Sequence, residues 1–182
     1  MTWNLDPAHS SLQFAVKHMV ISTVRGSFRD FTVEAAIDET DLAKSQATVR
    51  IDAASLTTGN DDRDAHLRSA DFLDAEHHPA LVFVTRKIEP RGGHDYRISG
   101  DLTIRDVTRP VVFEGEIQGP VKDPWGGVRF GLSATGKVNR KEFGLNWNAA
   151  LEAGGFLVGD DVKLSIETEL VKAVTPELTA VS

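Results

Sequence analysis

Apolar and polar residues alternate with a period of two through most of this 182-residue chain. In segment 128–138, for example, Phe130 and Leu132 fall on one side, whereas Ser133 and Lys137 fall on the other. This pattern is typical of a β-strand that buries one face and exposes the other. Eight segments show it: 11–19, 31–37, 47–53, 80–88, 96–104, 110–117, 128–138 and 161–170. The chain is therefore predicted to be all-β.

The eight segments each have a polar face, as strands do when one side of an antiparallel sheet meets water. Antiparallel strands in this number can close into a barrel, which removes exposed strand edges. We therefore predict an eight-stranded antiparallel β-barrel. A sandwich of two sheets is the competing arrangement.

Segment 60–76 lacks the alternation and has few β-branched residues. Asn60 can cap the start of a helix, Asp61 and Asp62 suit the positive end of its dipole, and Arg68 suits the negative end. The segment predicts a short helical insert, of about two turns, between the third and fourth strands.

Composition restricts the class of partner. The chain has 20 basic and 27 acidic residues and no cysteine. A formal charge of −7 without a basic cluster argues against nucleic acid and against an anionic membrane surface. The absence of cysteine excludes disulfides, thiol nucleophiles and thiolate metal sites. The start of the chain lacks the features of a signal peptide, and no segment is apolar enough to span a bilayer, so we expect a cytoplasmic protein.

One domain is expected over residues 1–171, followed by a C-terminal tail, 172–182, that frays. The predicted inner face of the barrel mixes large and small residues, and a barrel of this size either fills with side chains or holds one small ligand. The small residues leave apolar space, or the glycines among them only relieve strand curvature. The pattern leaves both possibilities open. The small residues are Ala35, Ala47, Ala53, Gly100, Gly115, Ala134 and Gly136.

Seven stretches in order resemble the YceI-like family of polyisoprenoid-binding proteins: HSSLQFAVKHM, VRGSF, RDAHLRSADFLD, HHPALVF, GDLTIRDVTRPV, NRKEFGLNW and VGDDVKLSIETEL. The resemblance covers about residues 3–171. It implies a lipocalin-like eight-stranded barrel with a helical insert and a long hydrophobic cavity that holds an isoprenoid chain. It also implies a possible homodimer. Family members are often exported, and the chain departs from them in lacking a signal peptide; it also has Asp106 where glycine is common.

The expected function is carriage or sequestration of a long isoprenoid lipid, such as a polyprenyl lipid or a quinone, without enzymatic activity and without a cofactor. Ligand contacts are expected from side chains on the predicted inner face. They are Phe14, Val16, His18, Phe31, Ile51, Phe83, Leu102, Phe130, Leu132 and Trp147. Two alternatives are an enzyme that acts on an isoprenoid or quinone, with His18 or His66 as acid–base, and a stress-related interaction module.

The stretch RDAHLRSADF, residues 63–72, has the charge density of a functional site. Arg63, His66 and Arg68 could contact the head group of a ligand. Alternatively, the charges form a clasp, with Asp64 and Arg68 paired four residues apart, while Leu67 and Phe72 plug the barrel end. The histidines lack the spacing of a zinc site, and sequence motifs of hydrolases, nucleotide-binding enzymes and metalloproteases are absent. No metal site is expected.

Overall fold

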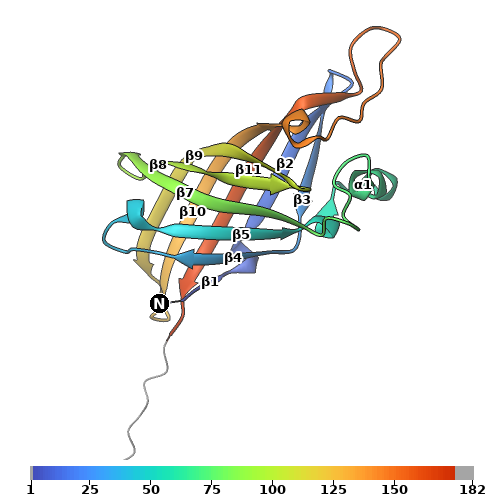
Figure 1. The fold of residues 1–182 in the computed structure, drawn as a ribbon. Helices are drawn as coiled ribbons and strands as arrows, with labels where there is room; N and C mark the ends of the chain where they lie inside the picture. Colours follow the sequence, from blue (N-terminus) through green and yellow to red (C-terminus); the bar gives the residue numbers. More distant parts are fainter. Residues whose placement is uncertain (1, 175–182) are drawn as a thin grey trace, which may run out of the picture.

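A computed structural model describes residues 2–174, and one curled antiparallel sheet contains every strand in this range (Figure 1). Its eleven strands are β1 (Trp3–Leu5), β2 (Ser11–His18), β3 (Ser22–Phe28), β4 (Phe31–Ala36), β5 (Gln46–Asp52), β6 (Leu56–Thr57), β7 (Ala80–Gly92), β8 (Asp95–Ile104), β9 (Val107–Lys122), β10 (Val128–Asn139) and β11 (Val158–Lys172). The strand order is β4-β5-β7-β8-β9-β10-β11-β2-β3-β6, and β1 pairs with β11. The sheet curls into a half-barrel, with β1 in contact with both β11 and β4.

All eight predicted strands are present, and the prediction of an antiparallel lipocalin-like barrel with a helical insert is confirmed. The strand count was too low, because β1, β3 and β6 were missed. Strands β1 and β6 have three and two residues, too few to show a period. In β3 the inward series is Val24, Gly26 and Phe28, and the glycine interrupts its apolar pattern.

The predicted helix is α1 (Asp61–Arg68), and it lies between β5 and β7 as expected. The Asn60 side chain caps it, since Oδ1 accepts a hydrogen bond of 3.0 Å from the Arg63 backbone N–H. Four short 3₁₀ helices complete the described secondary structure: η1 (Pro7–His9), η2 (Leu42–Lys44), η3 (Ala53–Ser55) and η4 (Arg140–Phe143). Helix α1 lies at one end of the sheet, beside β6 (Figure 1).

Strand β11 continues to Lys172, one residue beyond the predicted domain boundary at 171. Of the predicted tail, residues 175–182 lie outside the described range. Within residues 2–174, no helix has both the length and the apolar character needed to cross a membrane.

Candidate functional site

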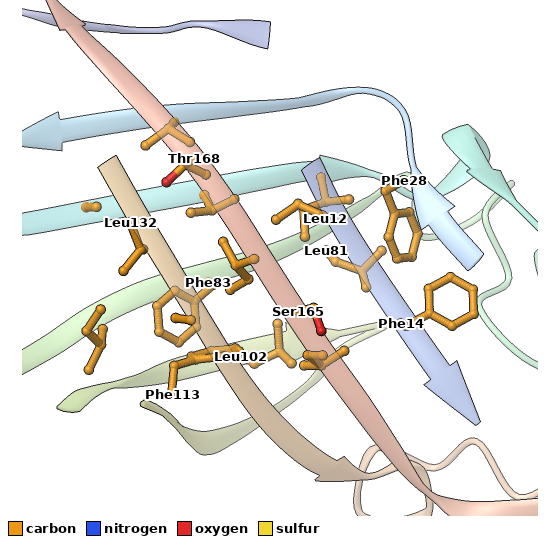
Figure 2. Close-up of a pocket in the computed structure, with 18 of the residues that line it drawn as sticks. Leu12, Phe14, Phe28, Leu81, Phe83, Leu102, Phe113, Leu132, Ser165 and Thr168 are labelled. Carbon is orange, nitrogen blue, oxygen red and sulfur yellow. The ribbon is translucent and has the colours of Figure 1, made fainter. Parts of the chain in front are cut away.

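The concave side of the sheet holds a cavity of about 310 Å³. Inward side chains from both halves of the sheet surround it, as Figure 2 shows for Leu12, Phe83, Leu102 and Leu132. Apolar cavities of about 150 Å³ stay dry and take up small hydrocarbons. The sequence left open whether the barrel is filled or hollow; in the structure it is hollow.

The lining is apolar almost throughout. Its polar members are Gln13, Ser45, Gln46, Thr85, Arg140, Ser165 and Thr168. On the strands, the period-two pattern explains the apolar lining residues, because alternate residues of each strand point inward. Thr85 and Ile88 both line the cavity despite their odd spacing, because the register of β7 shifts between Thr85 and Lys87.

The small inner residues play two different parts. Ala35, Ala47 and Ala134 line the cavity. The glycines instead accommodate neighbouring atoms: a Cβ on Gly136 would lie 2.7 Å from Cδ1 of Phe113, and one on Gly100 would lie 2.4 Å from Cζ of Phe83. These two glycines leave no empty space, because a phenylalanine ring already lies where their side chains would be. At Gly115 the close neighbour is the Ser133 backbone carbonyl. Relief of strand curvature by the glycines stays a prediction.

Seven of the ten predicted ligand contacts line the cavity, namely Phe14, Val16, Ile51, Phe83, Leu102, Phe130 and Leu132. Whether they bind a ligand stays a prediction. Sequence reasoning missed further members of the wall, although they lie on the inward faces of predicted strands and repeat with the same period. Among them are Leu81, Ile98, Phe113, Leu164 and Ile166.

The other three predicted contacts, His18, Phe31 and Trp147, are not part of the cavity wall. His18 ends β2 opposite Val158. Phe31 faces a separate depression beside Trp3 and Pro7. Trp147 packs edge-on against His66, with ring centroids 4.5 Å apart. Residues 145–157 do not alternate, so the sequence held no signal for the position of Trp147.

The charged segment 63–72 forms its hydrogen bonds with side chains and backbone groups of the protein itself. Arg63 donates from Nε to Thr58 Oγ1 at 2.7 Å, and Arg68 donates from Nη2 to the Leu56 carbonyl at 2.6 Å. His66 Nε2 lies 2.8 Å from Asp71 Oδ2. None of these three side chains lines the cavity, whereas Leu67 and Phe72 do. These contacts are those of a clasp, and a head-group contact by Arg63, His66 or Arg68 stays a prediction.

Asp64 is the buried carboxylate of this clasp, with 4% of its surface exposed. The expected pair with Arg68 does not form among the described residues; Oδ1 of Asp64 accepts hydrogen bonds from the Thr58 backbone N–H and hydroxyl instead. Burial raises the pKa of Asp64, but the bonds from Thr58 more than offset this, so its pKa lies below the ordinary value. The carboxylate therefore stays ionised at neutral pH.

Arg140 is a buried charge that the sequence did not reveal as part of the site. It follows β10, is 5% exposed and lines the cavity. Its guanidinium donates to the carbonyls of Leu145, Trp147 and Gly159 at 2.6, 2.9 and 2.8 Å. Burial lowers the pKa of this group from its ordinary value. Arg140 thus fixes the segment that connects β10 to β11.

One cluster, Asp6, His9 and Glu169, has side-chain atoms close enough together to hold a metal ion. Arg129 already supplies a cation there: Nη1 lies 2.9 Å from Asp6 Oδ2 and also pairs with Glu169, and Nε lies 2.7 Å from Asp123 Oδ2. Hydrogen bonds from these carboxylates, led by that of Asp123, raise the pKa of Arg129. The cluster is an ion-pair network that joins the start of η1 to β10 and β11, and none of its side chains lines the cavity.

Comparison with known proteins identifies a family model and relatives that match nearly the whole chain. The model of the YceI-like domain matches residues 3–170. A UPF0312 protein of Staphylococcus epidermidis is 39% identical over 168 residues, which cover 92% of this chain and 95% of that protein. A UPF0312 protein of Staphylococcus aureus is 38% identical over the same shares of both chains.

Solved structures agree. The Campylobacter jejuni YceI protein matches with a TM-score of 0.75 and 31% identity, over 87% of this chain and 90% of that one. A polyisoprenoid binding domain from Saccharophagus degradans matches with a TM-score of 0.67 over 94% and 98% of the two chains, and at 14% identity it supports the fold alone. From the match over nearly its whole length, we conclude that this chain belongs to the YceI-like domain family.

Proposed function

We propose that this protein binds a long-chain isoprenoid lipid, a polyprenyl lipid or a quinone, in the cavity of its half-barrel and carries or sequesters it. The observation that supports this most directly is the apolar cavity of about 310 Å³. The fold is compatible with it as well, since a solved structure with the same fold is named a polyisoprenoid binding domain.

Burial of hydrocarbon is sufficient to drive such binding. Each methylene-sized group removed from water contributes about 0.8 kcal/mol, so a five-carbon isoprene unit contributes about 3–4 kcal/mol. Immobilising a ligand costs about 4–15 kcal/mol. A few buried units therefore outweigh this cost without any charged contact. The proposed contacts are the seven wall residues Phe14, Val16, Ile51, Phe83, Leu102, Phe130 and Leu132.

A binding role fits this wall better than catalysis. The acid–base candidates of the enzyme alternative, His18 and His66, both lie off the cavity wall. Arg140, the charged residue among the lining side chains, has its N–H groups engaged by backbone carbonyls. The proposal includes no cofactor. It also includes homodimer formation, which light scattering tests, and a cytoplasmic location, which cell fractionation tests.

The decisive experiment is to purify the protein without detergent and to record its native mass spectrum, followed by organic extraction and mass analysis of the extract. We expect an adduct whose extracted mass corresponds to a chain of isoprene units with a head group. The proposal fails if the purified protein carries no hydrophobic adduct and the delipidated protein does not take up farnesol or a longer polyprenol.

A further inference from the structure

Exposed apolar side chains gather at one end of the half-barrel. The connection between β2 and β3 exposes 43% of Met19, 68% of Val20 and 84% of Ile21. Phe156, 58% exposed, lies on the loop before β11. A hydrogen bond of 2.8 Å from the Met19 backbone N–H to the Leu157 carbonyl connects the β2–β3 turn to this loop. Both segments lie at the same extremity in Figure 1. We call Met19, Val20, Ile21 and Phe156 the apolar tip.

The backbone of the apolar tip is unfavourable for these residues. Met19 and Val20 have φ angles of 52° and 67°, in the left-handed region. Asn and Gly suit this conformation at the tip of a hairpin, and a β-branched residue such as valine is disfavoured there. The turn thus combines backbone strain with large apolar side chains that are exposed to water. Strain of this kind is concentrated at functional sites.

Basic side chains lie on the outer face of the sheet next to the tip. From Ser11 to Phe28, the β2–β3 hairpin has no acidic residue in a chain with 27 of them. Arg25 and Lys163 both lie opposite Ala15 in register, on either side of it, and Lys17 is two residues further toward the tip. All three are exposed, and no ion pair between residues 2 and 174 involves them. We call Lys17, Arg25 and Lys163 the cationic row.

The acidic residues nearby are mostly matched by other bases. Asp160 lies 3.2 Å from Lys141 Nζ, and Asp161 lies 3.6 Å from Lys137 Nζ. Glu152 is exposed on the loop that carries Phe156. The overall charge of −7 predicts repulsion from an anionic surface, but local charge decides which face approaches one. The hairpin face carries the three basic side chains of the cationic row.

The tip also adjoins the cavity. His18, the residue before Met19, pairs with Val158, and Val158 and Val16 both line the cavity. The apolar tip therefore continues the apolar wall outward at this end of the half-barrel.

From these observations, we propose that the apolar tip inserts into the surface of a lipid bilayer while the cationic row contacts anionic lipid head groups, and that lipid moves between bilayer and cavity at this end. The transfer step rests on the proposed isoprenoid binding; the docking step stands on the tip and the row. Apolar side chains flanked by basic ones suit an anionic bilayer, because burial of the former and attraction of the latter add.

The test is co-sedimentation with vesicles of phosphatidylcholine alone and of phosphatidylcholine mixed with phosphatidylglycerol. The proposal expects the protein to bind the mixed vesicles and to leave them as salt concentration rises. Lys17→Gln is expected to weaken this binding about fivefold, since one basic residue is lost. The triple variant Lys17→Gln, Arg25→Gln, Lys163→Gln is expected to abolish it.

A second variant separates binding from folding. Met19→Asn with Val20→Gly relieves the turn and removes two apolar side chains, so it is expected to raise the melting temperature while it abolishes vesicle binding. Trp125→Ser is the matched control. Trp125 is 85% exposed in the β9–β10 turn, next to the β10 end that pairs with the C-terminal part of β11, and is thus remote from the tip. This control is expected to bind vesicles as the unchanged protein does.

Polyprenol uptake is measured, without vesicles, on the unchanged protein and on the same variants. If the unchanged protein takes up polyprenol but does not bind vesicles, the docking proposal is overturned and the isoprenoid proposal stands; if it binds vesicles without uptake, the reverse holds. A dimer in light scattering that the Met19→Asn, Val20→Gly variant dissociates, with no vesicle binding, assigns the tip to a second copy of the chain and also overturns the docking proposal.

Discussion

The Thr58 backbone N–H donates a hydrogen bond of 2.8 Å to Oδ1 of Asp64, one turn into α1. Arg63 donates to the Thr58 hydroxyl and carbonyl, so two successive helix residues, Arg63 and Asp64, are hydrogen-bonded to Thr58. Leu56, two residues before Thr58, is 3% exposed and lines the cavity. The charged segment thus fixes the end of the cavity wall through backbone contacts.

Removal of the Asp64 carboxylate should destabilise the fold. In Asp64→Ala, the partly buried N–H and hydroxyl of Thr58 lose their acceptor, and we expect the free energy of unfolding to fall by about 2–3 kcal/mol. Asp62→Ala, in the first turn of the same helix but exposed, is the control and should cost less than about 1 kcal/mol. Urea denaturation measures both. Equal losses would show that the clasp has no structural role.

The same carboxylate should contribute to acid sensitivity. Its pKa is lowered in the folded protein, so the unfolded chain binds the proton more tightly. The stabilisation is therefore complete at neutral pH and is lost as pH falls from the ordinary carboxyl value of about 3.9 toward the lowered pKa. Unfolding measured between pH 7 and pH 3 should show the difference between the unchanged protein and Asp64→Ala narrowing in acid. If the difference in unfolding free energy between the two proteins stayed constant with pH, the lowered pKa of Asp64 would be contradicted.

Gly136 should not tolerate a methyl group. A Cβ there would lie 2.7 Å from the Phe113 ring and 3.0 Å from the Val112 carbonyl oxygen, so the ring would have to move. We expect Gly136→Ala to cost about 1–3 kcal/mol of unfolding free energy, as overpacking does. Gly131→Ala on the same strand meets nothing within 4 Å and should be close to neutral. If both substitutions were neutral in thermal melts, Phe113 would not pack on this glycine.

Arg140 should be essential for the connection between β10 and β11. Arg140→Met keeps much of the side-chain volume but removes the donor to the buried Leu145 carbonyl and to the partly buried Trp147 and Gly159 carbonyls, and we expect a loss of about 3 kcal/mol or more of unfolding free energy. Lys141→Met removes only an exposed ion pair with Asp160, worth less than about 1 kcal/mol. Guanidinium denaturation compares them. A neutral Arg140→Met would mean that the carbonyls find other donors.

Filling the cavity should block lipid uptake. Leu132 points into the cavity (Figure 2), so the larger ring of Leu132→Trp occupies space that the ligand needs. We expect polyprenol uptake to fall at least about tenfold, with a stability cost of about 1–3 kcal/mol from overpacking. Val112→Trp adds the same ring on the outer face of β9, where Val112 is 47% exposed, and should leave uptake unchanged. Unchanged uptake by Leu132→Trp would place the ligand elsewhere.

The fold could be predicted from the sequence because burial of one strand face produces a regular alternation of apolar and polar residues. The eight predicted strands show this alternation, and the cavity residues on them follow it. In strand β3 the alternation is interrupted at Gly26, where a Cβ would lie 2.3 Å from the Phe14 ring, so packing requires a glycine in an apolar position.

Side chains that are placed by contacts between distant segments follow no such alternation, so their positions could not be predicted from the sequence. Trp147 was expected on the cavity wall, but its ring packs against His66 and Phe72 from α1 and the turn after it. The sequence did not indicate that Arg140 would be buried, because only the folded chain brings carbonyls from both sides of the β10–β11 connection around its guanidinium. Asp64 and Arg68 have the spacing of an ion pair, yet each meets better-placed backbone groups first.

The sparse hydrogen-bonding capacity of the cavity wall has a consequence for selectivity. A guest that enters such a space meets almost no directional partner, so shape and length discriminate among guests more than chemical detail does. A flexible hydrocarbon can also slide along the axis in small steps, since each step exchanges one set of non-directional contacts for an equivalent one.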